Sequence, residues 1–291
     1  MKLIQLQSIL DNEFGVKTNQ ENLVDFAVTP ENKKFINSEF IERKTGLMTK
    51  CSDEVQLVFT AVFITNEIIS QLDKYSNVVV VTHHNFNYFE DKRGLQSIDV
   101  NLLEKLAKNN NSIYVAHAPL DTHQIYGTSK CLAELCDVKI ESYFYDYFGS
   151  PTALIGKIEP IAFDNYTDKI MKKLERPFLT IEKYTNQISN IAVVAGGGDL
   201  PDLLQQVYDL GCDTLLTGTV EHLWDVPFIQ EGNKKFHELN KKLKVNLIGG
   251  THFGTERPAM VKLTEFFKKN GIDSKYLEDY SLLNFNKKKD L

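Results

Sequence analysis

Residues 78–85 read VVVVTHHN, and this stretch decides the fold class. Four consecutive valines predict a strand that is buried on both faces, as the strands of parallel sheets are. Apolar runs at 113–116 and 245–248 repeat the pattern, and segments with helical spacing of apolar residues lie between them. Because strands alternate with helices, the sequence predicts an α/β fold with two lobes, each a mixed β-sheet flanked by helices.

Further elements follow from the same patterns along the chain. We expect additional strands at 56–63, 191–195 and 214–216, and helices at 98–106, 128–135, 166–174, 201–210 and from Pro258 onward. Thr65 is expected to cap the helix that follows the first of these strands. The aromatic and proline-containing segment 137–190 is expected to hold strands and the crossing between the lobes. We therefore divide the chain into an N-terminal lobe, 1–136, and a C-terminal lobe, 137–291.

Composition excludes several classes of protein. The 291 residues carry 39 acidic and 33 basic side chains, and this balance argues against a general nucleic-acid binder. No apolar run approaches the roughly 18 residues of a membrane span, and the N-terminus turns polar too soon for a signal peptide. The cysteines form no C-x-x-C pair, so we expect reduced, buried thiols in a cytosolic protein. The lysine triplet at 287–289 is expected to be a solvated end.

Side chains with metal-binding or proton-transfer chemistry follow three of the predicted strands. They are His83 and His84 after the first, His117 and Asp121 after the second, and His252 and Glu256 after the third. Ligands of open α/β sheets bind beyond the carboxyl ends of the strands. Since neighbouring strands lie about 4.8 Å apart, we expect these groups to share one site in a cleft at that edge.

The residue types in this set favour a metal centre. Without His117, the set offers three imidazoles (His83, His84 and His252) and two carboxylates (Asp121 and Glu256). These five ligands include no thiolate and exceed the four ligands of a closed structural zinc site. They suit two ions about 3.5–4 Å apart with a bridging carboxylate. Zinc, manganese, iron(II), nickel and magnesium remain open, although imidazole favours zinc or iron. The alternative is a set of separate polar residues at caps and turns, with Asp121 in an Asx-turn after Pro119.

Other residues near these strand ends have two interpretations each. His117 and His222 are expected either to lie beside the metal ligands or the substrate, or to be ordinary core or loop histidines. Gly196-Gly197-Gly198 is expected to form a close-packed turn, with anion binding by the following helix start as the alternative. The aromatic run at 143–148 favours core or interface packing over base stacking. His237 lies in a charged segment and is expected at the surface.

Four blocks of sequence carry a resemblance to a known family. They are VVVVTHHN at 78–85, YVAHAPLDTHQIYGTSKCLAELC at 114–136, IAVVAGGGD at 191–199 with TLLTG at 214–218, and IGGTHFGTERPAMVKL at 248–263. In these blocks the chain resembles the NGG-interacting-factor-three-like family, whose bacterial members are labelled GTP cyclohydrolase I type 2 homologues or dinuclear metal centre hexameric proteins. Asn85 stands where that family usually has proline, and Gly127-Thr128 where it often has Gly-Asn. These departures concern the substrate more than the metal.

The resemblance implies a ligand set, an activity and an assembly. It matches His83, His84, Asp121, His252 and Glu256 to the ligands of two divalent ions, with zinc, iron or manganese expected. It implies hydrolysis of the GTP cyclohydrolase type, by a metal-activated water acting on a nucleotide or related small substrate. It also implies a cytoplasmic homohexamer with metal sites facing an internal cavity. The alternative function is a non-catalytic metal-binding scaffold or interaction protein.

Overall fold

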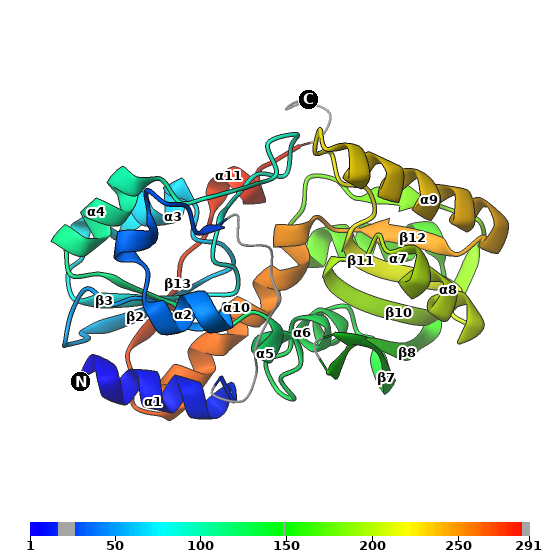
Figure 1. Cartoon of the computed structure of the whole chain (residues 1–291). Helices are drawn as coiled ribbons and strands as arrows, with labels where there is room; N and C mark the ends of the chain where they lie inside the picture. Colours follow the sequence, from blue (N-terminus) through cyan, green and yellow to red (C-terminus); the bar gives the residue numbers. More distant parts are fainter. Residues whose placement is uncertain (17–26, 148, 287–291) are drawn as a thin grey trace. The chain divides into compact units, whose positions relative to one another are not determined.

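The structure is a computed structural model that describes residues 1–16, 27–147 and 149–286 (Figure 1). The chain forms two compact units, each with its own large sheet. Unit 1 consists of Met1–Tyr88, Leu95–Tyr126 and Met260–Tyr280, and unit 2 consists of Phe89–Gly94, Gly127–Ala259 and Ser281–Leu291. Neither unit is a single stretch of chain, whereas the sequence analysis places one boundary after residue 136. The lysine triplet at 287–289 lies outside the described residues.

Unit 1 contains a five-stranded sheet in the order β1-β6-β3-β2-β13. Its strands are β1 (Gly46–Thr49), β2 (Leu57–Ala61), β3 (Val78–Thr82), β6 (Ser112–Val115) and β13 (Ser274–Tyr276). All neighbours run parallel except β1, which is antiparallel to β6. A separate hairpin pairs β4 (Asn87–Tyr88) with β5 (Leu95–Gln96). The strands predicted at 56–63, 78–81 and 113–116 are therefore confirmed as β2, β3 and β6.

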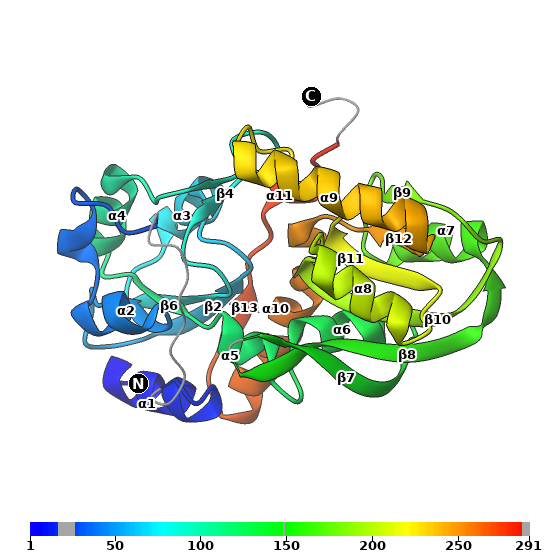
Figure 2. The same cartoon turned by 45° about the vertical axis from the view of Figure 1, so that its right-hand side comes forward.

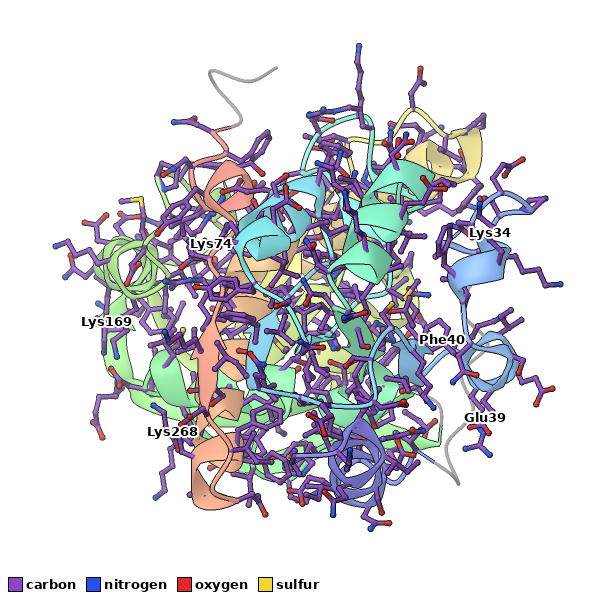
Figure 3. All side chains as sticks on the ribbon, turned by 90° about the vertical axis from the view of Figure 1, so that its left-hand side faces the viewer. Lys34, Glu39, Phe40, Lys74, Lys169 and Lys268 are labelled. Atoms are coloured by element: carbon purple, nitrogen blue, oxygen red, sulfur yellow. The ribbon has the colours of Figure 1, made fainter. Side chains whose placement is uncertain are left out.

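Helices cover both faces of this sheet, which explains the valine run of β3. The helices that belong wholly to unit 1 are α1 (Leu3–Glu13), α2 (Ser38–Arg43), α3 (Asn66–Gln71), α4 (Val100–Lys108) and α5 (Ala118–Asp121), with 3-10 turns η2 (Lys33–Phe35) and η3 (Leu72–Lys74). Val78 and Val80 belong to a core cluster with residues of α2, α3 and α4, including Phe40, which Figure 3 labels. On β2, the Thr60 hydroxyl donates to the Met260 carbonyl at 2.8 Å, so the part of α10 (His252–Lys269) that belongs to unit 1, from Met260 onward, also packs against this sheet.

Unit 2 contains a six-stranded sheet in the order β7-β8-β10-β11-β12-β9. Its strands are β7 (Lys139–Tyr147), β8 (Ser150–Ala162), β9 (Thr180–Glu182), β10 (Gln187–Gly197), β11 (Thr214–Thr219) and β12 (Asn246–Gly249). The central strands β10, β11 and β12 are parallel, and the flanking pairs are antiparallel. The carboxyl ends of β10, β11 and β12 therefore lie along one edge.

Successive side chains of β10 point to opposite faces of this sheet, and each face packs against a different set of helices. Ile191 and Val193 share a core cluster with α6 (Thr128–Leu135) and α7 (Phe163–Lys173). Ala192 and Val194 share another with α8 (Pro201–Asp209) and α9 (Pro227–Leu243), the helices in front of the sheet in Figure 2. A short helix, α11 (Tyr280–Leu283), follows β13. These units confirm the predicted α/β fold with mixed sheets flanked by helices.

The predicted start of α10 is wrong for a local reason, and α7 begins at Phe163, three residues before its predicted start. Helix α10 begins at His252 and contains Pro258 in its interior, because its first turns pack closely on the ends of β10 and β11. The helix predicted from the apolar stripe at 98–106 is present as α4, which begins after Asp99. The Asp99 carboxylate accepts a hydrogen bond from the Asn101 N–H as an N-cap, so Ile98 lies just before the helix. Thr65 caps α3 as predicted. In the described ranges no helix has the length and apolarity needed to cross a membrane.

The predicted aromatic run belongs to β7 as far as it is described. Phe144 and Tyr145 are half-buried and pack against the cluster formed with α8 and α9, and Tyr143 is exposed. The Tyr145 hydroxyl donates to Asp202 at 3.1 Å, and burial raises the pKa of Tyr145 to about 12. Phe148 lies outside the described residues. Packing therefore accounts for the two half-buried aromatic rings.

Candidate metal centre

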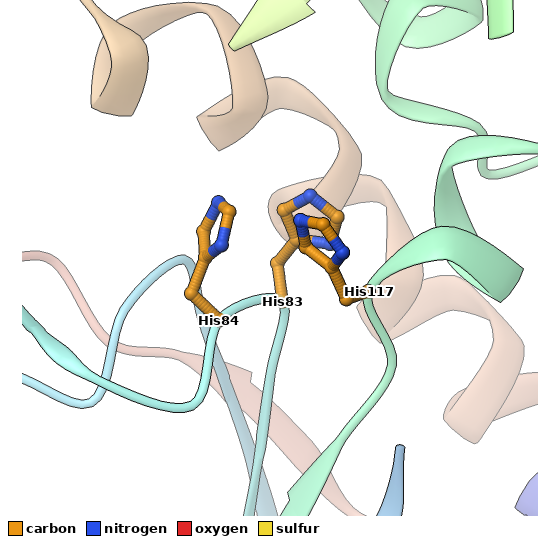
Figure 4. A group of neighbouring side chains, drawn as sticks. All are labelled: His83, His84 and His117. Carbon is orange, nitrogen blue, oxygen red and sulfur yellow. The ribbon is translucent and has the colours of Figure 1, made fainter. Parts of the chain in front are cut away.

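Three histidines gather in unit 1 where two parallel strands end. Strand β3 ends at Thr82 and pairs with Val115 at the end of β6, so the next residues of both strands meet at one edge. The ring centroids of His83, His84 and His117 lie 4.4 to 4.8 Å apart. One ligand nitrogen of each lies within 4.8 Å of the others. Figure 4 shows the three rings side by side beyond the strand ends.

Consecutive histidines reach one place because the strand has ended. The backbone N–H groups of His83 and His84 both donate to the Val62 carbonyl, which breaks the alternation of a regular strand. The Nδ1 atom of His83 lies 3.0 Å from the Ala116 carbonyl. A carbonyl oxygen only accepts, so Nδ1 carries the proton and the lone pair lies on Nε2. That is the arrangement in which an imidazole ligates a metal.

A carboxylate completes the group in unit 1. The Asp121 Oδ1 lies 3.4 Å from His83 Nε2, at the end of the short helix α5. His84 stacks on Phe63, with ring centroids 4.5 Å apart and an angle of 9° between the planes, and this contact fixes its ring. The histidines are almost fully buried, with at most 7% of each residue exposed. The structure thus brings together the predicted ligands His83, His84 and Asp121, and it adds His117 to them.

The other predicted ligands, His252 and Glu256, form a pair in unit 2. They occupy the first turns of α10 four residues apart, a spacing that places side chains on one face of a helix. The Nε2 atom of His252 lies 3.0 Å from the Glu256 Oε1. Glu256 is 3% exposed, so its carboxylate is held away from bulk solvent. The spacing of the two residues in the sequence suits either a loop or a first helical turn, and in the structure the first turns of α10 align the pair.

Glycines allow α10 to approach the end of the sheet this closely. Gly196 in β10 has φ +72°, and a Cβ there would overlap the Glu256 carboxylate and lie 3.1 Å from the His252 Nε2. The Gly196 N–H donates to the Thr255 hydroxyl at 3.0 Å, which fixes the same turn of α10. A Cβ at Gly218 in β11 would meet the same hydroxyl at 2.5 Å. The predicted turn is therefore wrong for Gly196 and Gly197, which belong to β10, but the predicted close packing is present at Gly196, where it leaves room for the His252–Glu256 pair.

A second histidine–carboxylate pair lies beyond the same strand ends of unit 2. His222 Nδ1 lies 2.6 Å from the Asp199 Oδ2, and both side chains are mostly buried. Asp199 is absent from the residues selected in the sequence, although the strand-end rule that selected His222 applies to it as well. His237, in contrast, is not a surface residue. It is half-buried and bonded to Glu182, which raises its pKa.

The cysteines take no part in this chemistry. Cys131, Cys136 and Cys212 are buried free thiols, as predicted, whereas Cys51 is only half-buried. Burial raises the pKa of Cys136 and of Cys212 to about 12, so both are protonated at neutral pH. Among the described residues, the His, Cys, Asp and Glu groups that lie close enough together to hold one ion include no cysteine. The donors in both units are therefore imidazole nitrogens and carboxylate oxygens, a set that fits divalent zinc, iron or manganese.

Comparisons with known proteins agree on one family. The family model described as Duf34/NIF3 (NGG1p interacting factor 3) matches residues 39–278. A protein of Borreliella burgdorferi named GTP cyclohydrolase 1 type 2 homolog is 27% identical over 66% of this chain and 71% of its own length. A protein of the same name from Archaeoglobus fulgidus is 24% identical over 84% of this chain and 92% of its own length.

Solved structures support the fold. Protein ybgI, of unknown function, has a TM-score of 0.72 at 19% identity and covers 96% of this chain and 98% of its own. A Bacillus cereus protein related to NIF3 has a TM-score of 0.68 at 13% identity and covers 97% of this chain and 98% of its own. At these identities the likeness concerns the fold alone.

Proposed function

Because the chain belongs to the Duf34/NIF3 family, we propose that it is a dinuclear metal-dependent hydrolase acting on a nucleotide or related small substrate. The proposed ligands of the two divalent ions are His83, His84, Asp121, His252 and Glu256. The observation that carries the proposal is the histidine cluster of unit 1, whose ligand nitrogens lie within 4.8 Å of one another. Buried imidazoles gathered so closely, with a carboxylate beside them, have the composition of a metal site.

The residues of unit 1 have distinct tasks in this proposal. His83 presents Nε2 because its Nδ1 is bonded to the Ala116 carbonyl. Asp121, 3.4 Å from that Nε2, supplies negative charge that offsets a cation. His117 lies beside both histidines and orients them or contacts the substrate.

Unit 2 contributes the remaining charge. Glu256 and His252 form the second part of the ligand set, and Gly196 leaves the space in which the Glu256 carboxylate lies. Glu256 and Asp121 are the two carboxylates that would offset the positive charge of the ions when these are bound. Two divalent ions in such a site lower the pKa of water and stabilise charge that develops on the substrate.

The proposed reaction follows the names of the relatives. Both similar proteins described above are named GTP cyclohydrolase 1 type 2 homolog, so we propose hydrolytic ring opening of a purine nucleotide as the first reaction to test. A competing proposal is a metal-binding scaffold without catalysis, which the description of the family as an interacting factor favours. Both proposals require the same metal ligands, but only the hydrolase would turn over a substrate.

Metal content is the decisive first measurement. Protein purified without chelators should contain about two ions per chain by elemental analysis, and His83→Ala and Glu256→Ala should each lower that number. His237→Ala is the matched control, because His237 is also bonded to a carboxylate but lies on α9. Equal metal content in all four proteins would refute the site. If wild-type protein turns over GTP and His84→Ala does not, the hydrolase is supported, whereas a fully loaded protein without turnover favours the scaffold.

We also propose that the chain assembles into a homohexamer in the cytoplasm. Strand β7 forms an edge of the unit 2 sheet, and its exposed Tyr143 offers apolar surface for contact with another copy. Light scattering of the purified protein tests the assembly, and a monomer at micromolar concentration would contradict it.

A further inference from the structure

Hydrogen bonds and an aromatic contact hold the pair formed by His222 and Asp199 in a defined geometry. The two side chains are 14% and 10% exposed, and the 2.6 Å hydrogen bond joins Nδ1 to Oδ2. Asn233 holds the backbone of His222 from both sides, since its Oδ1 accepts from the His222 N–H and its Nδ2 donates to the His222 carbonyl. The Trp224 ring meets the imidazole edge-on, with centroids 4.5 Å apart. The imidazole is therefore fixed in position and orientation.

The pair leaves one ring nitrogen available for chemistry. A carboxylate only accepts hydrogen bonds, so Nδ1 of His222 carries a proton that it donates to Asp199. Among residues 1–16, 27–147 and 149–286, no group is hydrogen-bonded to the His222 Nε2. An imidazole oriented by a carboxylate through Nδ1, with Nε2 facing the reactants, is the recurring proton-transfer unit of hydrolases.

The position of the pair in the fold connects it to the candidate metal ligands of the same unit. Gly197 pairs with Thr219 at the ends of β10 and β11, and Asp199 and His222 follow those residues. Gly196, which contacts Glu256, lies three residues before Asp199. Three residues of chain span at most about 11 Å. The pair therefore lies at the same sheet edge as Glu256 and close to it.

A short loop contacts both the start of α10 and the surroundings of His222, which is independent evidence that they lie near each other. The carboxylate of Glu90 accepts a hydrogen bond of 3.0 Å from the N–H of Phe253, the residue after His252. Four residues later, Gly94 lies flat against Trp224, because a Cβ at Gly94 would come within 2.6 Å of the indole. The same short loop thus touches the start of α10 and the tryptophan beside His222.

We propose that His222 is a catalytic residue of the proposed hydrolase and that Asp199 is its positioning residue. The inference rests on the proposed function and deepens it. As the substrate C–N bond breaks, its electron pair stays on nitrogen and the His222 Nε2 gives that nitrogen a proton. The oxygen of water bonds to the carbon as a hydroxyl group, and the other proton of that water goes to Nε2, where it replaces the proton given to nitrogen. Atoms and charge balance without another reactant.

The other carboxylate-paired histidine of unit 2 provides a contrast. His237 is bonded to Glu182, whose other oxygen accepts from Asn240, so that pair ties the edge strand β9 to helix α9. Glu182 pairs with Leu247 in β12, two residues before the carboxyl end of that strand. This pair has a structural task, and the His237→Gln variant is the matched control.

Trp224 gives the experiment a readout other than turnover. It is the one tryptophan of the sequence, and its ring contacts His222. We would titrate metal-loaded protein with GTP, follow Trp224 fluorescence and measure turnover and metal content in parallel. The variants are His222→Gln, Asp199→Asn and His237→Gln.

Each expected result separates this inference from the proposed function. GTP should change the Trp224 emission of wild type, and His222→Gln should weaken the apparent affinity about 10-fold through loss of a charge-assisted hydrogen bond. Turnover should fall about 10²–10⁴-fold in His222→Gln. Asp199→Asn should lower kcat with little change in GTP affinity, and His237→Gln should match wild type. All variants should retain the metal content of wild type.

Other results would overturn the inference. If His222→Gln turned over GTP as fast as wild type, or gave the same Trp224 fluorescence response to GTP, His222 would not contact the substrate. A Trp224 emission of the wild-type protein that GTP does not change would also overturn the inference. If the protein binds no metal and does not hydrolyse GTP, the proposed function fails. In that case a GTP response that depends on His222 would still place the nucleotide at the pair.

Discussion

Replacing Gly196 with alanine tests whether the close approach of β10 and α10 serves the candidate metal centre. The alanine Cβ would overlap the Glu256 carboxylate and lie 3.1 Å from the His252 Nε2. A carboxylate at the end of a flexible side chain moves aside at little cost, so the fold tolerates the change. The ligand geometry does not, because the carboxylate leaves the position that the glycine opened for it.

The size of the effect follows from two separate contributions. Gly196 has φ +72°, and alanine in that left-handed conformation costs about 1–2 kcal/mol. Gly211 has φ +74° and no atom within 4 Å of its would-be Cβ, so Gly211→Ala carries the same backbone strain without the contact. Both variants should lose a few degrees in Tm. Only Gly196→Ala should lose metal affinity, by about 10–100-fold, as for other changes that disturb the groups supporting a ligand.

The assay compares the two alanine variants directly. Metal affinity is measured by competition with a chromogenic chelator, and the Tm is measured on the same metal-free samples. Equal metal affinities in Gly196→Ala and Gly211→Ala would refute the reasoning, because the contact with Glu256 would then have no bearing on the ions. A Tm loss in Gly196→Ala far beyond that of Gly211→Ala would show that the contact is structural.

Three further predictions concern stability and the tryptophan environment. The hydrogen bond to Glu182 raises the pKa of His237, so the pair stabilises the fold below pH 6.5, and this stabilisation is lost as the pH rises through the raised pKa of His237. The pKa of Glu182 is lowered, so the stabilisation is also lost in acid, where Glu182 takes up a proton. Denaturant titrations of His237→Gln should show a deficit of about 1 kcal/mol that is largest between pH 4.5 and 6.5, and a deficit that grows above neutral pH would contradict this assignment. Gly94→Ala, with φ +55° and the indole 2.6 Å from the new Cβ, should shift Trp224 emission to the red; an unchanged spectrum would mean that the loop does not rest on the ring. Thr65→Ala should cost about 1–2 kcal/mol through loss of the α3 cap, Thr65→Ser should restore most of it, and equal stability of the two variants would refute the capping role.

Strong local signals account for what the sequence predicts correctly. The four valines from Val78 identify a strand buried on both faces, and the two core faces of unit 1 explain why no polar residue interrupts them. Helix α6 has the predicted bounds, 128–135. The start of α10 is mistaken because proline favours the first turn of a helix. Close packing at Gly196 and Gly218 overrides that preference, and a single sequence does not show which segments will pack together.

The sequence predicts which residues form the candidate site, but it does not predict how their side chains are arranged. The strand-end rule selects His83, His84 and Asp121 because parallel strands end along one edge. The same rule would have selected Asp199, but an aspartate after a glycine turn is also an ordinary turn residue. That His117 stacks on His83 depends on the register between β3 and β6, which is a property of the sheet and not of either segment alone.

The discontinuous course of unit 1 has a consequence for its biosynthesis. Strand β13 pairs in parallel with β2, although more than 200 residues of chain separate them, and it forms the outer strand of the sheet. During translation the sheet of unit 1 therefore keeps an uncovered strand until residues 274–276 have been made. Most of unit 2 is synthesised by then. A chain that stops before residue 274 leaves β2 as an open edge, which is a template for aggregation. Premature termination before residue 274 should therefore give insoluble rather than partly active product.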